Sequence, residues 1–192
     1  EGGRIDHALH GTNAKRALED TLAFDHAIET ALAYMEKKDP GLKHTLVVVT
    51  ADHDHNMVFN GYSKLGNPIL GKVADYQSGQ LAKDMDGKPY TTLAFGNGGR
   101  PNASAGSQVN PEDGNQPWIA PARGAVRDDL SAVDTTDDNY LQEVGLNLGT
   151  PGAETHGGGD VMLFAGGAGA KRFKGTMDNT KVFFKVKEAA GL

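Results

Sequence analysis

Apolar residues near the N-terminal end recur at the spacing of one face of an α-helix. The pattern predicts an amphipathic helix over 14–37, with Thr12 or Asn13 as its N-cap and Asp39-Pro40-Gly41 as its end. A continuous β-branched run over 45–51 follows, and a strand without polar alternation is typical of a sheet covered on both faces. A helix followed by a buried strand predicts an α/β layer.

Shorter apolar runs predict further elements. Strands are expected over 57–59, over 90–95 before a glycine-rich stop, and over 161–165. Apolar residues at helical spacing predict a closing helix over 180–190, capped near Asp178. No repeat and no linker that would separate two domains is visible in the sequence.

The segment 100–151 has little hydrophobic periodicity and is rich in Gly, Pro, Asn and Asp. This composition predicts a loop-rich insertion at the surface, within which 139–148 is compatible with a short strand or a short helix. Five of its aspartates are expected to be solvated, although such a cluster could also hold Ca²⁺: Asp128, Asp129, Asp134, Asp137 and Asp138.

Composition narrows the classes of function. The 192 residues contain Lys+Arg 19 and Asp+Glu 25, a net charge of -6, with no basic stripe that would favour nucleic-acid-specific binding. No apolar run approaches the roughly 18 to 20 residues of a membrane span. Cysteine is absent, so any metal must be bound by His, Asp and Glu.

Acidic and histidine side chains gather beside three of the predicted elements. Asp6 and His10 precede the long helix and are four residues apart, so a helical turn would place both on one face. Asp52-His53-Asp54-His55 follows the buried strand, where ligands bind in open α/β sheets. His156 precedes a later strand. Carboxylate and imidazole are the ligands that zinc accepts when thiolates are absent.

Each group also has an ordinary structural explanation. An Asp-His dipeptide at a strand end is often only a capping pair, and in a regular strand the adjacent Asp52 and His53 would point to opposite faces. His10 alone is typical of a partly exposed helix residue, His156 is equally a turn residue, and Glu1 is equally a frayed terminus. Three other histidines are assigned to no metal site and are expected at the surface: His7, His26 and His44.

Three blocks of the chain together resemble the alkaline phosphatases: Glu1-Gly2-Gly3-Arg4-Ile5-Asp6-His7-Ala8-Leu9-His10, Thr50-Ala51-Asp52-His53-Asp54-His55 and Glu154-Thr155-His156-Gly157-Gly158. Their order and intervals are similar to those in the second half of that family, and so is the helix between the first two. The resemblance implies an α/β three-layer sandwich with a central, mostly parallel sheet. Residues 1–192 would be the C-terminal part of one such domain, with a loop-rich insertion at about 100–151.

The resemblance also implies a set of metal ligands. They are Asp6, His10 and His156 for a first zinc ion, Asp52 and His53 for part of the shell of a second zinc ion, and Glu1 for magnesium. His55 is expected either beside the site without binding a metal or as a residue with no role in it.

The activity that the resemblance implies is hydrolysis of phosphate monoesters through a phosphoserine intermediate, with two Zn²⁺ and one Mg²⁺. The family's nucleophilic serine and phosphate-binding arginine precede the block that matches Glu1. This chain is therefore expected to lack them and to need an upstream N-terminal segment of the same enzyme. Homodimerisation and a periplasmic or secreted location are implied by the family alone. Two alternatives stay open: another phosphohydrolase of the superfamily, such as a phosphodiesterase or phosphonate hydrolase, and a non-catalytic metal-binding fragment.

Overall fold

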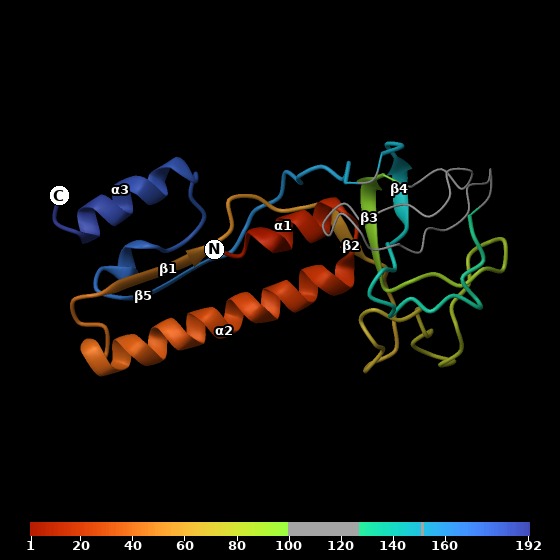
Figure 1. Cartoon of the computed structure of the whole chain (residues 1–192), viewed down its shortest axis with the longest axis horizontal. Helices are drawn as coiled ribbons and strands as arrows, with labels where there is room; N and C mark the ends of the chain where they lie inside the picture. Colours follow the sequence, from red (N-terminus) through yellow and green to blue (C-terminus); the bar gives the residue numbers. More distant parts are fainter. Residues whose placement is uncertain (100–126, 151) are drawn as a thin grey trace. The chain divides into compact units, whose positions relative to one another are not determined.

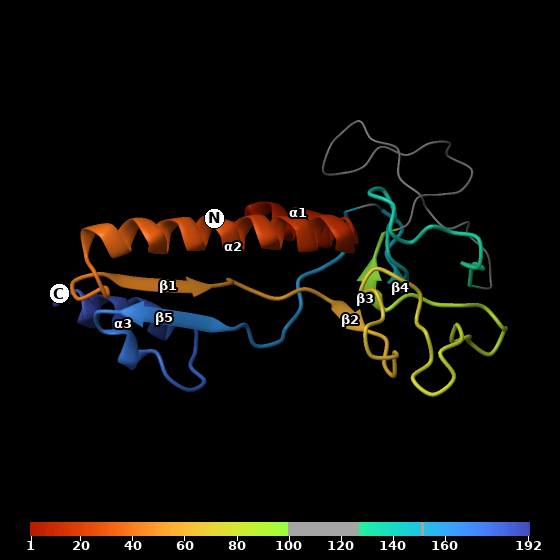
Figure 2. The same cartoon turned by 90° about the horizontal axis from the view of Figure 1, so that it is seen from below.

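A computed structural model describes residues 1–99, 127–150 and 152–192 (Figures 1 and 2). The chain folds as two compact units. The first consists of Glu1–Leu22 with His55–His156, and the second of Ala23–Asp54 with Gly157–Leu192. No helix in the described part of the chain is long and apolar enough to cross a membrane.

Two helices open the chain. Helix α1 covers Gly3–His10 and helix α2 covers Ala14–Lys38, so the helix expected over 14–37 is confirmed. Of the two expected caps, Asn13 serves, because its side-chain Oδ1 accepts the Arg16 N–H at 3.0 Å. Asn13 also donates through Nδ2 to the Asp138 carbonyl at 2.8 Å, which ties the junction between the helices to a distant segment.

The first unit contains a three-stranded sheet of β2 (Met57–Phe59), β3 (Leu93–Gly98) and β4 (Val144–Asn147) in that order. Strand β3 runs antiparallel to β2 and parallel to β4. A buried cluster forms where the start of α2 meets β3, and it joins Ala14, Leu93 and Phe95. Leu9 of α1 and Leu18 of α2 pack against this cluster, so the end of α1, the start of α2 and the sheet share one small core.

Strand β3 lies three residues later than the expected strand over 90–95 and runs on through the glycines that were expected to stop it. Close packing explains the difference at Gly98. A Cβ atom there would lie 2.7 Å from Thr12 Cγ2 and 2.9 Å from Val144 Cγ1. Only glycine lets the strand pass between those two side chains, so here glycine continues the strand instead of breaking it.

The second unit contains the rest of α2 and a two-stranded antiparallel ribbon of β1 (Leu46–Thr50) and β5 (Leu163–Gly167), seen side by side in Figure 2. A short 3₁₀ turn η2 (Ala170–Arg172) leads to helix α3 (Thr180–Ala189). Asp178 accepts the backbone N–H of Thr180 at 3.0 Å, as expected of a residue near the start of this helix. Residues 46–49 of β1 are only half-buried.

The described residues agree only in part with two sequence expectations. They form two small sheets, in which β1 pairs antiparallel with β5, and the expected three-layer sandwich with a central, mostly parallel sheet is not confirmed. The expected insertion at 100–151 falls partly outside the described residues, at 100–126 and 151. Its described part is mostly irregular, but β4 pairs within the sheet and Leu130, Tyr140 and Leu141 are buried. Hydrophobic periodicity does not reveal these contacts, because isolated apolar residues in an irregular segment have no period. The loop-rich insertion itself stays a prediction.

Candidate metal centre

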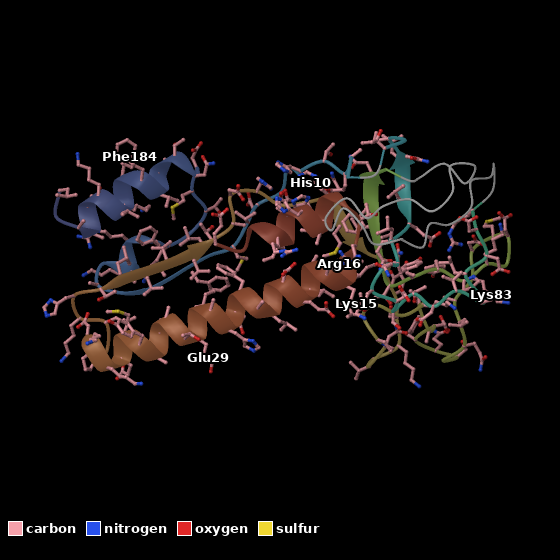
Figure 3. The ribbon with its side chains drawn as sticks, in the orientation of Figure 1. His10, Lys15, Arg16, Glu29, Lys83 and Phe184 are labelled. Carbon is pink, nitrogen blue, oxygen red and sulfur yellow. The ribbon has the colours of Figure 1, made fainter. Side chains whose placement is uncertain are left out.

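Helix α1 presents Asp6 and His10 on one face, as their spacing predicts. The distance between Asp6 Oδ1 and His10 Nε2 is 3.3 Å. The other ring nitrogen of His10, Nδ1, lies 2.5 Å from the carbonyl oxygen of Glu154. That carbonyl accepts a hydrogen bond from the Nδ1–H group, so Nε2 keeps its lone pair and faces Asp6 as a potential metal ligand. His10 projects from the end of α1 in Figure 3.

His156 reaches the same place from the other end of the chain. Its Nε2 lies 3.1 Å from His10 Nε2 and 3.3 Å from Asp6 Oδ1. The three atoms form a nearly equilateral triangle. A tetrahedral zinc ion that binds such atoms at roughly 2.0–2.1 Å holds them roughly 3.3–3.4 Å apart. The donor set and its spacing therefore fit one zinc ion.

His55 and Glu154 form hydrogen bonds beside this triangle of ligand atoms. His55 Nε2 lies 2.9 Å from Asp6 Oδ1 and its Nδ1 lies 2.6 Å from Glu154 Oε2. The Glu154 side chain is completely buried, and its second oxygen accepts the Asn56 N–H at 2.8 Å. Each ring nitrogen of His55 thus lies within hydrogen-bonding distance of a carboxylate. That His55 stands beside the metal without binding it stays a prediction.

Glu154 is a residue of this cluster to which sequence reasoning gave no role. It stands in the Glu-Thr-His block, but a sequence pattern does not say whether a carboxylate is buried. His10, His55 and Glu154 also offer ligand atoms within 4.8 Å of one another, so the described cluster has more ligand atoms than a single ion needs. The useful signal would have been an acidic residue two positions before a candidate histidine ligand.

The three histidines keep Asp6 ionised. Partial burial alone would raise the pKa of the Asp6 carboxyl, but the adjacent His10, His55 and His156 outweigh it and hold that pKa below its usual value. A carboxylate that is charged at neutral pH and surrounded by imidazoles attracts a divalent cation.

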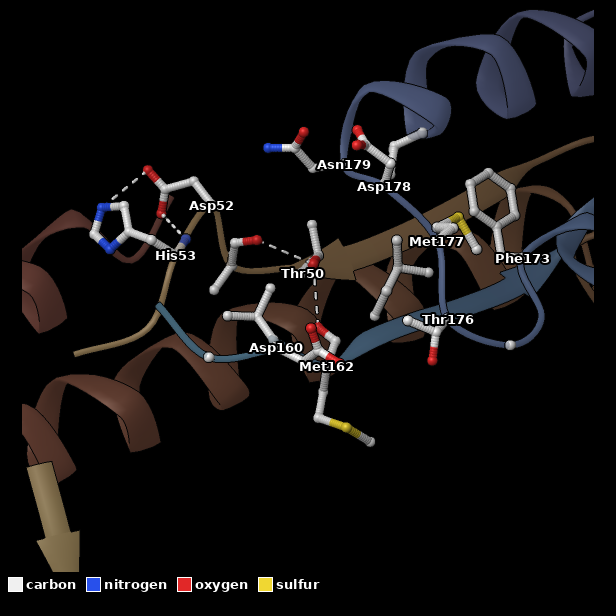
Figure 4. Close-up of a pocket in the computed structure, with 16 residues that line it drawn as sticks. Thr50, Asp52, His53, Asp160, Met162, Phe173, Thr176, Met177, Asp178 and Asn179 are labelled. Carbon is white, nitrogen blue, oxygen red and sulfur yellow. Dashed lines mark hydrogen bonds and ion pairs between the residues drawn. The ribbon is translucent and has the colours of Figure 1, made fainter. Parts of the chain in front are cut away.

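Asp52 and His53 lie in the second unit, just beyond the end of β1 (Figure 4). The chain has left the regular strand there, because the Asp52 carboxylate accepts the His53 N–H at 3.2 Å and lies 3.4 Å from His53 Nε2. The adjacent side chains thus face each other rather than opposite sides. They line one end of a cavity of about 700 Å³ whose walls include Thr50, Asp160 and Asp178.

Several other residues considered in the sequence analysis lie at the protein surface. Glu1 is exposed and lies just before α1, and its expected role in magnesium binding stays a prediction. His7, His26 and His44 are exposed, as expected. Asp129 and Asp134, two of the five aspartates expected to be solvated, are exposed. They accept hydrogen bonds from Ser131 and Thr136 within local turns.

A carboxylate–imidazole cluster on an α/β scaffold defines a candidate metalloprotein. The comparison with protein families is more specific: the chain belongs to the alkaline phosphatase family, because the model of that family matches residues 1–192. It is 38% identical over 190 residues to the tissue-nonspecific alkaline phosphatase of Gallus gallus, covering 99% of this chain and 30% of that protein. It is 35% identical to an alkaline phosphatase of Gadus morhua, with coverages of 99% and 33%.

A solved structure shares the fold. It is a histidine-to-aspartate mutant of TAB5 alkaline phosphatase with Mg bound in its M3 site, and it matches with a TM-score of 0.50 and 21% identity. The match covers 100% of this chain and 34% of that one. The chain thus spans about a third of the length of the alkaline phosphatases it matches.

Proposed function

We propose that this chain supplies most of the zinc ligands of a phosphate monoester hydrolase. The observation that carries the proposal is the triangle of Asp6 Oδ1, His10 Nε2 and His156 Nε2, whose sides measure 3.1 to 3.3 Å. Membership of the alkaline phosphatase family supports metal-dependent hydrolysis of phosphate monoesters in general. Asp52 and His53 would contribute to a second zinc ion, and Glu1 would bind magnesium.

The residues of the first unit prepare the site for a cation. Asp6 would contribute a negative charge, His10 and His156 would each contribute an imidazole nitrogen, and His55 lies within hydrogen-bonding distance of the Asp6 carboxylate. When bound, zinc supplies Lewis acidity that stabilises charge on a phosphoryl group. Asp6, His10 and His156 would hold the ion, and catalytic zinc sites with three protein ligands typically leave one position for water or substrate.

We infer that the complete enzyme works through a phosphoserine on a segment upstream of this chain. The chain spans only 30% of the Gallus gallus relative, and the blocks it carries contain no candidate serine. That segment would also complete the sheet into the three-layer sandwich expected of a single domain. Two Zn²⁺ and one Mg²⁺ per site, a homodimer and a periplasmic or secreted location are part of the same proposal.

Substitution of one ligand tests the proposal. In the full polypeptide that carries this sequence, His156→Ala is expected to lower zinc content and p-nitrophenyl phosphate hydrolysis together, each by at least about tenfold, because the first site keeps only two ligands. Zinc is measured by elemental analysis and hydrolysis by absorbance, before and after chelation. His7→Ala is the control, since His7 is exposed on the same helix. Unchanged zinc stoichiometry in His156→Ala contradicts the assignment, and activity that resists chelation contradicts the metal mechanism.

A further inference from the structure

Asp54 lies between the two histidines of the Asp-His-Asp-His motif and has no role in the proposed function. In the second unit, both of its carboxylate oxygens lie 3.1 Å from the Gly159 backbone N–H. Its own carbonyl oxygen accepts the Gly157 N–H at 2.8 Å. One residue therefore holds the glycine loop 157–159 through its side chain and its main chain.

The loop is shaped around this carboxylate. A Cβ atom on Gly157 would lie 2.5 Å from Asp54 Oδ1, and one on Gly159 would lie 2.5 Å from Asp54 Oδ2, whereas a Cβ on Gly158 would meet nothing within 4 Å. Two of three consecutive glycines are thus required by the same side chain. A loop that merely needed flexibility would not distinguish the middle glycine from its neighbours.

The glycine loop 157–159 that Asp54 holds is next to a proposed zinc ligand in the sequence. Gly157 directly follows His156, and Asp54 directly precedes His55. In the first unit, His55 and His156 face each other in an isolated antiparallel bridge, and Asn56 Nδ2 donates to the Thr155 carbonyl at 2.7 Å. The backbone that carries His156 is therefore held before the histidine by Asn56 and after it by Asp54.

We propose that Asp54 is a positioning residue for zinc binding, whose carboxylate holds the glycine loop 157–159 so that the His156 imidazole is set before the metal arrives. The inference rests on the proposed function, since it concerns the His156 ligand. It adds a residue that touches neither metal nor substrate. Ligands whose supporting contacts are already formed lose less conformational freedom when a metal binds, so the contact should slow zinc release.

The experiment uses the full polypeptide with Asp54→Ala and Asp54→Asn. In the metal-free protein, Asp54→Ala is expected to raise hydrogen exchange at the Gly159 amide by at least about tenfold and, after zinc loading, to speed zinc release to a chelator by about 10- to 100-fold. Asp54→Asn keeps one amide oxygen as an acceptor, so both effects should fall to within about threefold of wild type. A purely structural residue would change thermal stability without changing zinc release.

A matched pair of glycine variants repeats the test without altering Asp54. Gly159→Ala is expected to behave like Asp54→Ala because the added methyl displaces the carboxylate, while Gly158→Ala should match wild type in exchange and in zinc release. This pair also decides the outcome if Asp54→Ala fails to fold.

Different results would contradict the proposed function and the proposed role of Asp54. If wild type binds no zinc, the proposed function is wrong and this inference is wrong with it. If wild type binds zinc and both Asp54→Ala and Gly159→Ala release it at the wild-type rate, only the role of Asp54 is overturned.

Discussion

Glu154 is a fully buried carboxylate at the base of the histidine cluster. A buried charge is tolerated only when it is paired and hydrogen-bonded. Glu154 meets this requirement with His55 Nδ1 at 2.6 Å and the Asn56 N–H at 2.8 Å. His55 also lies 2.9 Å from Asp6, so Glu154 contacts a proposed metal ligand indirectly, through the His55 ring.

We expect Glu154→Gln to weaken zinc binding by about 10- to 100-fold, because glutamine keeps the size of the side chain but removes the charge that orients His55. A zinc competition titration measures the effect. Glu29→Gln is the control, since Glu29 is exposed on α2 (Figure 3), and it should bind zinc like wild type. Equal zinc affinity for Glu154→Gln and wild type would show that the orientation of His55 does not depend on Glu154.

At the scale of elements, Arg127 ties the residues before β4 to a distant turn. Its guanidinium binds Glu143 with two hydrogen bonds of 2.6 and 2.9 Å and Asp84 with one of 2.6 Å. Asp84 in turn accepts the Lys88 N–H at 2.8 Å. The Lys88 hydrogen bond first, and then Arg127, lower the pKa of Asp84 below its usual value.

The lowered pKa of Asp84 predicts that the folded protein loses stability at acidic pH. A carboxyl whose pKa is lower in the folded than in the unfolded protein stabilises the fold above the unfolded value of about 3.9, and this contribution is lost as the pH falls through the folded value. Asp84→Asn should therefore show a smaller loss of stability on acidification than wild type, measured as urea midpoints from about pH 6 down to about pH 2.5.

Asp86→Asn is the matched control, because Asp86 is an exposed residue of the same turn and should keep the wild-type slope. If wild type and Asp84→Asn lost stability in parallel, the pKa of Asp84 would be the same in the folded and unfolded protein, and the charge of Asp84 would not stabilise the fold. Part of the slope should persist in either case, since other aspartates, including Asp75 and Asp178, also have lowered pKa values.

At the scale of the whole molecule, the second unit leaves much apolar surface uncovered. Met162 and Phe164 on and beside β5 are 72% and 62% exposed, and Phe183 and Phe184 on α3 are 67% and 59% exposed (Figure 3 labels Phe184). Soluble proteins rarely leave large apolar groups exposed together without a partner. The exposure supports the proposal that a further segment of polypeptide covers this unit.

We expect the 192-residue chain on its own to bind a hydrophobic dye and to associate at micromolar concentration, as measured by fluorescence and sedimentation velocity. Phe164→Lys with Phe183→Lys should reduce both. Tyr62→Lys, at an 84% exposed position of the first unit, serves for comparison and should have a smaller effect. A monomer that binds no dye would show that these faces need no cover.

Local sequence patterns were enough to predict several helices and strands and the candidate metal ligands. The period of apolar residues predicted α2 almost to the residue and the β-branched run predicted β1, because helix and strand periods depend on near neighbours. The four-residue spacing of Asp6 and His10 predicted their shared face for the same reason. The family and its candidate ligands were also readable from the order of three short blocks.

Only the tertiary structure decided which distant groups meet. His10 and His156 are 146 positions apart. The burial of Glu154, the packing of Gly98 between two distant side chains and the hydrogen bonds of Asp54 to the glycine loop 157–159 also depend on segments brought together from far along the chain. The antiparallel partner of β1 was likewise unpredictable, since the backbone edge of a strand can pair in either direction. Residue type and spacing specify what a side chain can do, whereas burial and neighbours, which are set by long-range packing, determine what it does.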